Sequence, residues 1–288
     1  MVSVIIPAYN RAKTIGASIR SVLSQTYRNL ELIIVDDCSA DNTSEVVHSI
    51  SDARLRYVRL VKNSGACAAR NAGIEMAQGD LLAFHDSDDL WHEDKLAKQI
   101  AVLQFGSADV CFCKMNRFSA NGTLLDIMPS HISNGLVHGK ADLFGVGTQT
   151  LLGRRAVFEA EKFDPAMPRF QDYELLIRIQ RKFKLYCVDK ALVDWTLSED
   201  SISRNCGALL AAAKLLLKKY DAFQEEHPVA SASIASMLLS DFARNKSING
   251  SNELKQEACA TALRMSRCPR VLAKCLMLKV GLLEKVLK

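Results

Sequence analysis

The sequence of 288 residues lacks the features that would assign it to the secreted, membrane-spanning or nucleic-acid-binding classes. Its first residues, Met1 to Pro7, contain no basic segment followed by a long apolar one, so we expect no signal peptide. No uncharged stretch is long enough to span a bilayer. The net charge is only +5, without a long basic run before the C-terminus, so nucleic acid is not expected as a partner.

The nine cysteines are an odd number and do not follow the spacing of a metal site. They are typical of reduced, mostly buried thiols in a cytoplasmic protein. No repeat of fixed period and no low-complexity tract is present. Hydrophobic residues make up 49% and charged residues 24%, as in a globular protein. The length is large for a single core and predicts one large domain with an appendage.

The acidic stretch Asp86-Ser87-Asp88-Asp89 is the most informative part of the chain. It follows the short apolar run Leu81–Phe84, which reads as a buried parallel strand, and precedes helical spacing from Trp91 to Phe105. Ligands of open α/β sheets bind at this carboxyl edge. Three carboxylates repel one another unless a divalent metal with diphosphate oxygens, or an arginine, lies among them. An N-terminal helix cap would explain one acid but not three.

Strands and helices alternate through the first hundred residues, which predicts an α/β protein with a parallel, doubly wound sheet. The expected strands are Val2–Ile6, Glu31–Val35, Leu55–Leu60 and Leu81–Phe84, and the helices between them are Thr14–Gln25, Asp41–Ile50 and Ala66–Ala77. Four candidate functional residues fall at strand ends or in the loops after them: Tyr9, Asp37, Gly65 and Asp88. This agreement is stronger than any single motif.

The rest of the chain is less regular. We expect strands at Val110–Asn116, Thr148–Leu152, Leu185–Val188 and Ala191–Trp195, and a helix from Gln171 through Arg181. The glycine-punctuated stretch 118–147 has no clear pattern and is expected to frame an acceptor cleft. From Gly207 onward the pattern is helical alone. We therefore predict a catalytic domain at 1–205 and a helical region at 206–288.

No G-x-G-x-x-G follows the first strand, which argues against a dehydrogenase-type dinucleotide site. Tyr9 instead offers a ring at the sheet edge that can stack on a nucleobase, although a rim tyrosine would look the same. Asp37 can accept hydrogen bonds from a base or a ribose, or can cap a turn. Gly65 allows a ligand to approach the backbone closely, although a glycine in a plain turn would look the same. Arg70 can pair with Asp86 or a phosphate.

Asp172 lies at a helix start, far along the chain from the other candidates. It can serve as a general base that deprotonates an acceptor hydroxyl. An acid stabilised by the helix dipole would occupy the same position. Spacing alone does not decide between these two interpretations.

Five motifs in order resemble the family 2 glycosyltransferases of the GT-A fold. They are P-A-Y-N (7–10), V-D-D-x-S (35–39), N-x-G-x-x-x-A-R-N-x-G (63–73), D-S-D-D (86–89), and F-D with Q-D-Y-E-L-x-x-R (163–164 and 171–178). The resemblance covers about residues 1 to 203. It implies an inverting transfer of sugar from a nucleotide-diphosphate sugar, UDP-sugars being favoured, to an acceptor hydroxyl on a glycan or lipid-linked molecule, as in bacterial surface polysaccharide synthesis.

The same resemblance implies roles for individual residues. Asp172 would be the catalytic base, and Asp88 would bind a divalent Mn²⁺ or Mg²⁺. The nucleotide-sugar-binding residues would be Pro7, Ala8, Tyr9, Asn10, Asp37, Gly65, Arg70, Asp86 and Ser87. The chain departs from the family where an acid often precedes the base, because Gln171 stands there. It also lacks the histidine that often follows an aromatic-Arg pair, since the chain reads Trp195-Thr196-Leu197-Ser198.

Two other classes fit part of the pattern. The run Ile33–Asp37 resembles the acidic pair of a receiver-like signalling module, although receivers carry the pair after their first strand and are much shorter. A non-catalytic nucleotide-sugar-binding protein would keep the same site residues.

The C-terminal segment Cys268–Lys288 combines apolar and basic residues, with Glu284 as its one acid. It fits a helix that closes the preceding helices or one that lies in the interface of an anionic membrane. We therefore expect a cytoplasmic protein that can associate peripherally with the inner face of the cell membrane.

Overall fold

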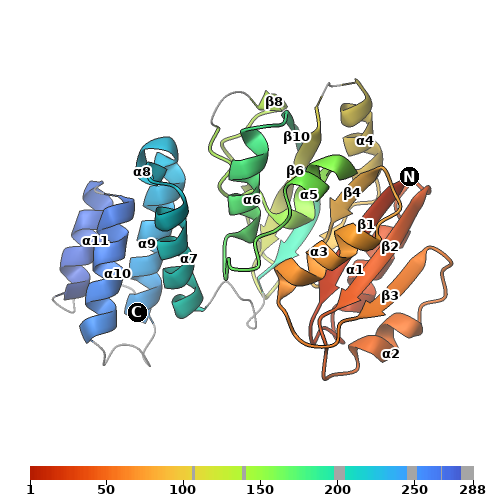
Figure 1. The fold of residues 1–288 in the computed structure, drawn as a ribbon, viewed down its shortest axis with the longest axis horizontal. Coiled ribbons are helices and arrows are strands. Elements are labelled where there is room, and N and C mark those ends of the chain that lie inside the picture. The colour runs from red at the N-terminus through yellow and green to blue at the C-terminus, as the bar shows by residue number, and fades with distance from the viewer. Residues whose placement is uncertain (106–107, 138–140, 198–204, 245–251, 267, 280–288) are drawn as a thin grey trace. The chain divides into compact units, whose positions relative to one another are not determined.

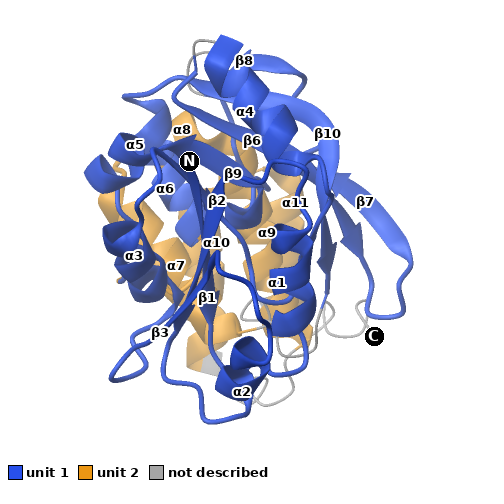
Figure 2. Cartoon of the chain, turned by 90° about the vertical axis from the view of Figure 1, so that its right-hand side faces the viewer, with its two compact units in different colours: residues 1–165, 171–198 blue, residues 166–170, 199–288 orange. Residues whose placement is uncertain are grey.

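The computed structural model describes residues 1–105, 108–137, 141–197, 205–244, 252–266 and 268–279. It divides the chain into two compact units, shown in separate colours in Figure 2. Unit 1 comprises residues 1–165 and 171–198, and unit 2 comprises 166–170 and 199–288. The boundary predicted at residue 205 adjoins the segment 198–204, which lies outside the described residues.

Unit 1 is built on a ten-stranded sheet (Figure 1) with the order β3-β2-β1-β4-β9-β6-β10-β5, while β7 pairs with β6 and β8 with β10. The strands are β1 (Val2–Ala8), β2 (Leu30–Asp36), β3 (Leu55–Arg59), β4 (Leu81–Phe84), β5 (Leu90–Trp91), β6 (Val110–Phe118), β7 (Leu124–Met128), β8 (Gly135–Val137), β9 (Leu151–Arg154) and β10 (Leu185–Thr196). The α/β class expected from the sequence is confirmed.

The first four strands pair in parallel, and the two at the centre of this half of the sheet, β1 and β2, are the most deeply buried. Every residue of β1 and β2 is buried, so both faces of this half of the sheet must be covered by helices. Val2 of β1 pairs with Leu30 of β2 and with Leu81 of β4, which aligns the carboxyl ends of these strands at one edge. Antiparallel strands enter at β9, which pairs with both β4 and β6.

Helices cover both faces of the sheet (Figure 1). They are α1 (Ile15–Leu23), α2 (Thr43–His48), α3 (Ala66–Met76), α4 (Lys95–Phe105), α5 (Arg155–Ala160) and α6 (Gln171–Gln180). Side chains of α1, α2 and α4 share one core with Val4 and Ile6 of β1. On the other face, Gly73 of α3 lies against Ile5, and Phe158 of α5 packs on Phe84 with ring centroids 4.8 Å apart.

The structure corrects several details after residue 118. Thr148–Thr150 forms a 3-10 turn, η1, and the strand expected there begins only at Leu151. The stretch without a clear pattern contains β7 and β8, whose mostly exposed residues gave no alternation to detect. The two strands expected near residue 190 are one strand, β10, with register shifts between Val188 and Val193.

Unit 2 consists of helices within the residues that the structure describes. They are α7 (Cys206–Lys219), α8 (Phe223–Glu226), α9 (Pro228–Arg244), α10 (Asn252–Met265) and α11 (Pro269–Lys279). Helix α11 packs on α9 and α10 and buries Val271, Cys275 and Leu278. These residues recur at helical spacing, so α11 closes the helical unit with one face. Residues 280–288 of the predicted C-terminal helix lie outside the described part.

Candidate functional site

The acid cluster Asp86–Asp89 lies between β4 and β5, at the carboxyl edge of the parallel strands. Nη2 of Arg70, from α3, donates a hydrogen bond of 2.7 Å to Oδ1 of Asp86. Nε of Arg11, from the loop after β1, lies 3.8 Å from Oδ2 of Asp88. Two arginines therefore face three carboxylates, and Arg70 supplies an arginine partner for Asp86, one of the two alternatives that the sequence left open. Burial raises the pKa of Asp88, and the nearby charge of Asp86 raises it further.

Asp89 is the most deeply buried member of the cluster, with 1% of its surface exposed. Both oxygens of its carboxylate are buried without a hydrogen-bond partner of normal geometry among the described residues, although the Gln149 amide lies near enough to offset part of the pKa shift. Burial raises the pKa of Asp89 well above its usual value, with the charges of Asp86 and Asp88 adding to the effect. The edge is therefore short of positive charge.

Helix α1 holds the loop that carries these acids. Ser18 and Ser21 of α1 and Gln25, two residues beyond its end, follow one another at helical spacing. Ser18 Oγ donates to the carbonyl of Asp89 at 2.8 Å, and Ser21 Oγ accepts from the amide of Trp91 at 3.2 Å. Gln25 accepts from the amide of Leu96 and donates to the carbonyl of His92. These bonds hold the backbone from residue 89 to 96, directly after Asp86 and Asp88.

The carboxylates of the acid cluster fit a hard divalent metal only in combination with other ligands. No group of three His, Cys, Asp or Glu side chains converges as a complete metal site within the described residues. Asp88 is still suited to the purpose, since its carboxylate is desolvated and its arginine partner is distant. Metals such as Mg²⁺ are commonly held by one or two carboxylates together with phosphate oxygens and water.

The end of β1 presents Tyr9 to solvent. Its side chain is 45% exposed, whereas Pro7 and Ala8 are buried in the sheet. Pro7 and Ala8 can therefore meet a ligand only through backbone at this edge. Asn10 adopts a left-handed φ of 53°, and its Oδ1 accepts a hydrogen bond from the amide of Ala40 at 2.8 Å. The exposed ring of Tyr9 is thus placed on a turn that Asn10 braces.

Asp37 is buried and holds the loop before α3. Its Oδ1 accepts from the amide of Ser64 and its Oδ2 from the amide of Gly65, both at 2.7 Å. Gly65 has a φ of 87°, which side-chain-bearing residues rarely adopt, and the space where a Cβ would stand is open. A base or ribose contact of Asp37 would therefore use the remaining lone pairs of a carboxylate that already positions the glycine.

Asp172 lies in the first turn of α6, and Gln171 before it contacts α3. Arg70 Nη1 donates to Gln171 Oε1 at 3.1 Å, so one guanidinium links the acid cluster to the helix that carries Asp172. Asp172 Oδ1 accepts from the amide of Tyr173 at 2.7 Å. Burial raises the pKa of the Asp172 carboxyl, and this rise is opposed by that hydrogen bond and by the charge of Arg70.

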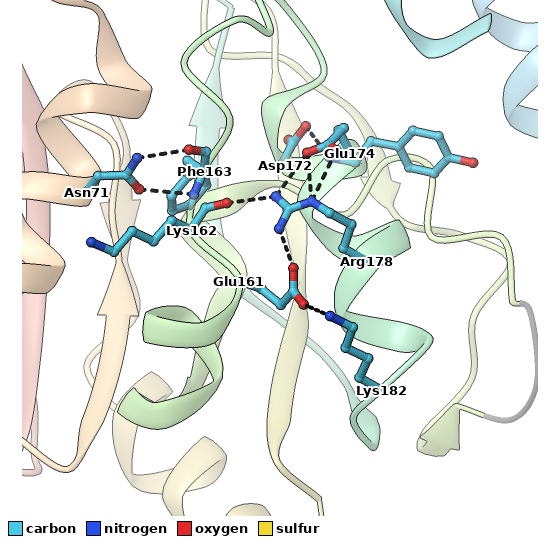
Figure 3. Close-up of polar contacts among 9 residues, drawn as sticks. Asn71, Glu161, Lys162, Phe163, Asp172, Glu174, Arg178 and Lys182 are labelled. Carbon is cyan, nitrogen blue, oxygen red and sulfur yellow. Dashed lines mark hydrogen bonds and ion pairs between the residues drawn. The ribbon is translucent and has the colours of Figure 1, made fainter. Parts of the chain in front are cut away.

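A polar network fixes α6 relative to α3 (Figure 3). Arg178 of α6 donates to Glu174, to Glu161 at 2.6 Å and to the carbonyl of Lys162 at 2.7 Å. Asn71 of α3 brackets the next residue, accepting from the amide of Phe163 at 3.0 Å and donating to its carbonyl at 2.8 Å. The pairing of α3 with the segment before α6 is therefore set by side chain to backbone bonds.

Sequence reasoning did not assign roles to Arg11, Asn71 or Arg178. Arg11 directly follows one of the quoted motifs, and Asn71 and Arg178 belong to two others, so the motifs could have marked these residues as candidates. Only the structure identifies what these side chains contact, because their partners lie 77, 92 and 17 residues away. Among the departures, Gln171 reaches Arg70, while the position of the missing histidine, Ser198, lies outside the described residues.

The fold and this edge define a glycosyltransferase of the GT-A class. The sequence pattern of Glycosyl transferase family 2 matches residues 3–160, more than half of the chain. The chain belongs to this family. The receiver-like alternative is thereby set aside, in keeping with the burial of Asp36 and Asp37 and their engagement in hydrogen bonds.

Curated relatives are bacterial glycosyltransferases. TuaG of Bacillus subtilis (strain 168), provisionally assigned to teichuronic acid biosynthesis, is 35% identical over 211 residues, 71% of this chain and 82% of that one. WfgD of Escherichia coli, named as a UDP-Glc:α-D-GlcNAc-diphosphoundecaprenol β-1,3-glucosyltransferase, is 33% identical over 209 residues, 71% of this chain and 80% of that one.

Solved structures share the fold. The crystal structure of S. aureus TarS 1-349 in complex with UDP-GlcNAc matches with a TM-score of 0.67 and 19% identity, covering 99% of this chain and 90% of that one. The mannosyltransferase PcManGT of Pyrobaculum calidifontis, in complex with GDP-Man and Mn²⁺, matches with a TM-score of 0.60 and 17% identity, covering 99% and 86%.

Proposed function

We propose that this family 2 glycosyltransferase inverts configuration as it transfers a sugar from a nucleotide-diphosphate sugar, preferentially a UDP-sugar, to an acceptor hydroxyl. The observation that carries the proposal is the link made by Arg70. It bonds Asp86 of the acid cluster and Gln171 beside Asp172, so the groups for the diphosphate and for the acceptor proton meet at one sheet edge. The name of WfgD supports a UDP-sugar as donor.

The donor would lie along the carboxyl ends of β1, β2 and β4. The exposed ring of Tyr9 would stack on the base, and Asp37 would contact the base or ribose. Gly65 leaves open space for the backbone to approach the ligand, and Arg70 brings a guanidinium beside Asp86. Asp86 and Ser87 would contact the ribose and diphosphate. These roles agree with the exposure of Tyr9 and the rigidity of the turns that carry the other residues.

Asp88 would hold a divalent cation, Mn²⁺ or Mg²⁺, with diphosphate oxygens and water. Such a cation neutralises the charge that develops on the departing nucleoside diphosphate. The excess of negative charge among Asp86, Asp88 and Asp89 favours cation binding. PcManGT, which shares the fold, was crystallised with Mn²⁺.

Asp172 would take the proton from the acceptor hydroxyl, which then attacks the anomeric carbon opposite the leaving diphosphate. Its carboxylate is held by the Tyr173 amide on a helix fixed through Arg178 (Figure 3), so it is prepositioned. Burial raises its pKa, which makes it a stronger base than an exposed aspartate. The alternative of a nucleotide-sugar-binding protein without catalysis predicts binding but no turnover.

A donor panel tests the proposal directly. The purified chain is incubated with UDP- and GDP-sugars, with Mn²⁺, Mg²⁺ or a chelator, and released nucleoside diphosphate is measured with and without saccharide acceptors. We expect metal-dependent release from one class of donor. Saturable donor binding without release under every condition would instead support the non-catalytic alternative.

Gln171→Glu is expected to move the acidic limb of the kcat pH profile to higher pH by about one unit. The new carboxylate would pair with Arg70, whose charge lowers the pKa of Asp172, and would add negative charge next to it. A base with a raised pKa is protonated, and so inactive, up to a higher pH. The control is Gln104→Glu, an exposed change on α4. An unchanged limb in Gln171→Glu would contradict an electrostatic role for this position.

The acceptor is proposed to be a glycan or lipid-linked saccharide, as the names of both relatives suggest. Every helix in the described part of the chain is too short or too polar to cross a bilayer. Helix α11, however, displays Leu272 and Leu276 at 43% and 67% exposure outside its buried face, and Arg270, two residues before Leu272, is also exposed. This arrangement supports peripheral contact with an anionic membrane at the inner face of the cell membrane.

The double variant Leu272→Gln with Leu276→Gln is expected to lose binding to vesicles of anionic phospholipid, while donor turnover in solution stays unchanged. The apolar area that enters the interface is removed, but the buried face of α11 remains. Val229→Gln, an exposed apolar position on α9, is the matched control. Co-sedimentation with anionic and neutral vesicles measures the difference. Equal partitioning of all three proteins would exclude α11 as the membrane contact.

A further inference from the structure

Three polar side chains meet beside the acid cluster without belonging to any motif noted above. His92 Nε2 lies 2.9 Å from Asp194 Oδ1, and Asn116 Nδ2 donates to the same oxygen at 2.7 Å. They come from three segments: the residue after β5, β6, and β10. The side chains of His92 and Asp194 remain 38% and 30% exposed. We call these three residues the His92 trio.

Strand register places the His92 trio at the edge where the acids lie. Phe84, the last residue of β4, is followed within four residues by Asp88. Ala83 pairs with Leu152 of β9, and the neighbouring Leu151 pairs with Phe112 of β6, so Asn116 lies four residues beyond the level of Phe84. Asp194 pairs with Asn116 and with Leu90, which directly follows the cluster. The negative charge of Asp194 is felt at Asp89, whose pKa it helps to raise.

The His92 trio also lies on the same face of the sheet as Arg70. Trp91, Met115 and Val193, the neighbours of the trio in sequence, are buried in the core beneath α1 and α4. Because side chains alternate along a strand, the trio points to the opposite face. That face carries Ile5, against which α3 packs, and α3 carries Arg70.

The chemistry of the His92 trio suits a sugar ring. With Nε2 directed at Asp194, a neutral His92 donates there and presents Nδ1 as an acceptor. Both hydrogen bonds to Asp194 end on Oδ1, and none of the described residues bonds Oδ2. Two acceptors thus remain for hydroxyl groups. Phe118, half-buried two residues beyond Asn116, supplies an apolar surface on the same face. The negative charge of Asp194 disfavours a phosphate at this point.

We propose that His92, Asn116 and Asp194 form the subsite that binds the acceptor's sugar ring through adjacent hydroxyl groups. The inference rests on the proposed glycosyl transfer, because the acid cluster and Asp172 would place the donor on the adjacent side. The subsite takes a neutral, hydroxyl-rich unit. Any diphosphate of a lipid-linked acceptor lies elsewhere.

Asp194→Asn and His92→Ala test the proposal in the full chain. Each removes an acceptor for a sugar hydroxyl, and we expect the KM for a saccharide acceptor to rise about tenfold. Donor affinity and the slow hydrolysis of donor without acceptor should stay within about twofold, since no donor contact is lost. Asp189→Asn is the matched control, because Asp189 also lies on β10 and pairs with β6, through Lys114 at 2.6 Å. Its acceptor KM should not change.

Binding of methyl glycosides of glucose, galactose and N-acetylglucosamine, followed by saturation-transfer NMR, separates the two hypotheses. Binding that requires Asp194 in a chain that turns over no donor would support the subsite and reject the glycosyl transfer. Turnover with an unchanged acceptor KM in both variants would reject the subsite alone. Parallel loss of donor hydrolysis and transfer would assign the His92 trio to the fold of the edge instead, and would also overturn the proposal.

Discussion

Asp88→Asn is expected to abolish sugar transfer while the protein stays folded. Asp88 has only a long ion pair, with Arg11 Nε 3.8 Å from its Oδ2, and an amide would bind a divalent cation far more weakly. A carboxyl whose pKa is raised by folding destabilises the folded state at neutral pH. Removing its charge should therefore leave the thermal unfolding midpoint without metal unchanged or higher.

The measurement combines donor turnover over a range of Mn²⁺ and Mg²⁺ concentrations with thermal unfolding. Asp80→Asn is a suitable control, because Asp80 precedes the same strand at its opposite end and is largely exposed. We expect this control to keep wild-type turnover. Transfer at the wild-type rate by Asp88→Asn, with metal limiting, would remove Asp88 from the proposed metal site.

The parallel half of the sheet could be predicted because its residues leave little choice. The runs Val2–Ala8 and Leu30–Asp36 are mostly apolar on both faces, so they are stable when buried on both faces, and the polar residues that follow them must then meet at one edge. That is why residues as distant as Tyr9 and Asp88 could be assigned to one site. The helices α1 and α6 followed from their apolar spacing, and α3 followed from its small residues after the turn at Gly65.

The rest of the sheet could not be predicted, because its strands do not show the continuous apolar pattern of β1 and β2. β7 is mostly exposed and, among the described strands, pairs with β6 alone, so it lacks an apolar period. β9 is shifted because Gln149 and Thr150, although buried, form a 3-10 turn held by a bond from Thr150 Oγ1 to the carbonyl of Gly147. A short segment that is buried but not paired in a sheet has the same sequence pattern as a buried strand.

Within the site, the sequence identified chemical types but not partners. Asp37 was expected to face a ligand, and the structure engages both of its oxygens with the backbone of the glycine loop. Arg70 was expected to pair with Asp86 or with a phosphate; it bonds Asp86, but its second bond to Gln171 was not foreseen. Long-range pairs of this kind depend on which helices cover the same face of the sheet, and a single sequence does not encode that contact directly.

Asp172→Asn is expected to lower kcat by about two to four powers of ten, the usual contribution of a general base, with donor affinity nearly unchanged. The asparagine keeps the size of the side chain and its hydrogen bond from the Tyr173 amide, so the first turn of α6 should be preserved. The base is lost, however, because an amide cannot accept the acceptor's proton. The acidic limb of the pH profile, which reports deprotonation of Asp172, should disappear with it.

Donor affinity, measured by calorimetry, and single-turnover transfer separate the possible roles of Asp172. Glu159→Gln, an exposed change on α5, serves as the control for removing a carboxylate outside the site and should behave as wild type. Loss of donor affinity with kcat preserved would make Asp172 a binding residue, and the base would have to lie elsewhere. If the rate falls but the acidic limb of the pH profile stays in place, another group titrates in the reaction. That result would also show that the base is not Asp172.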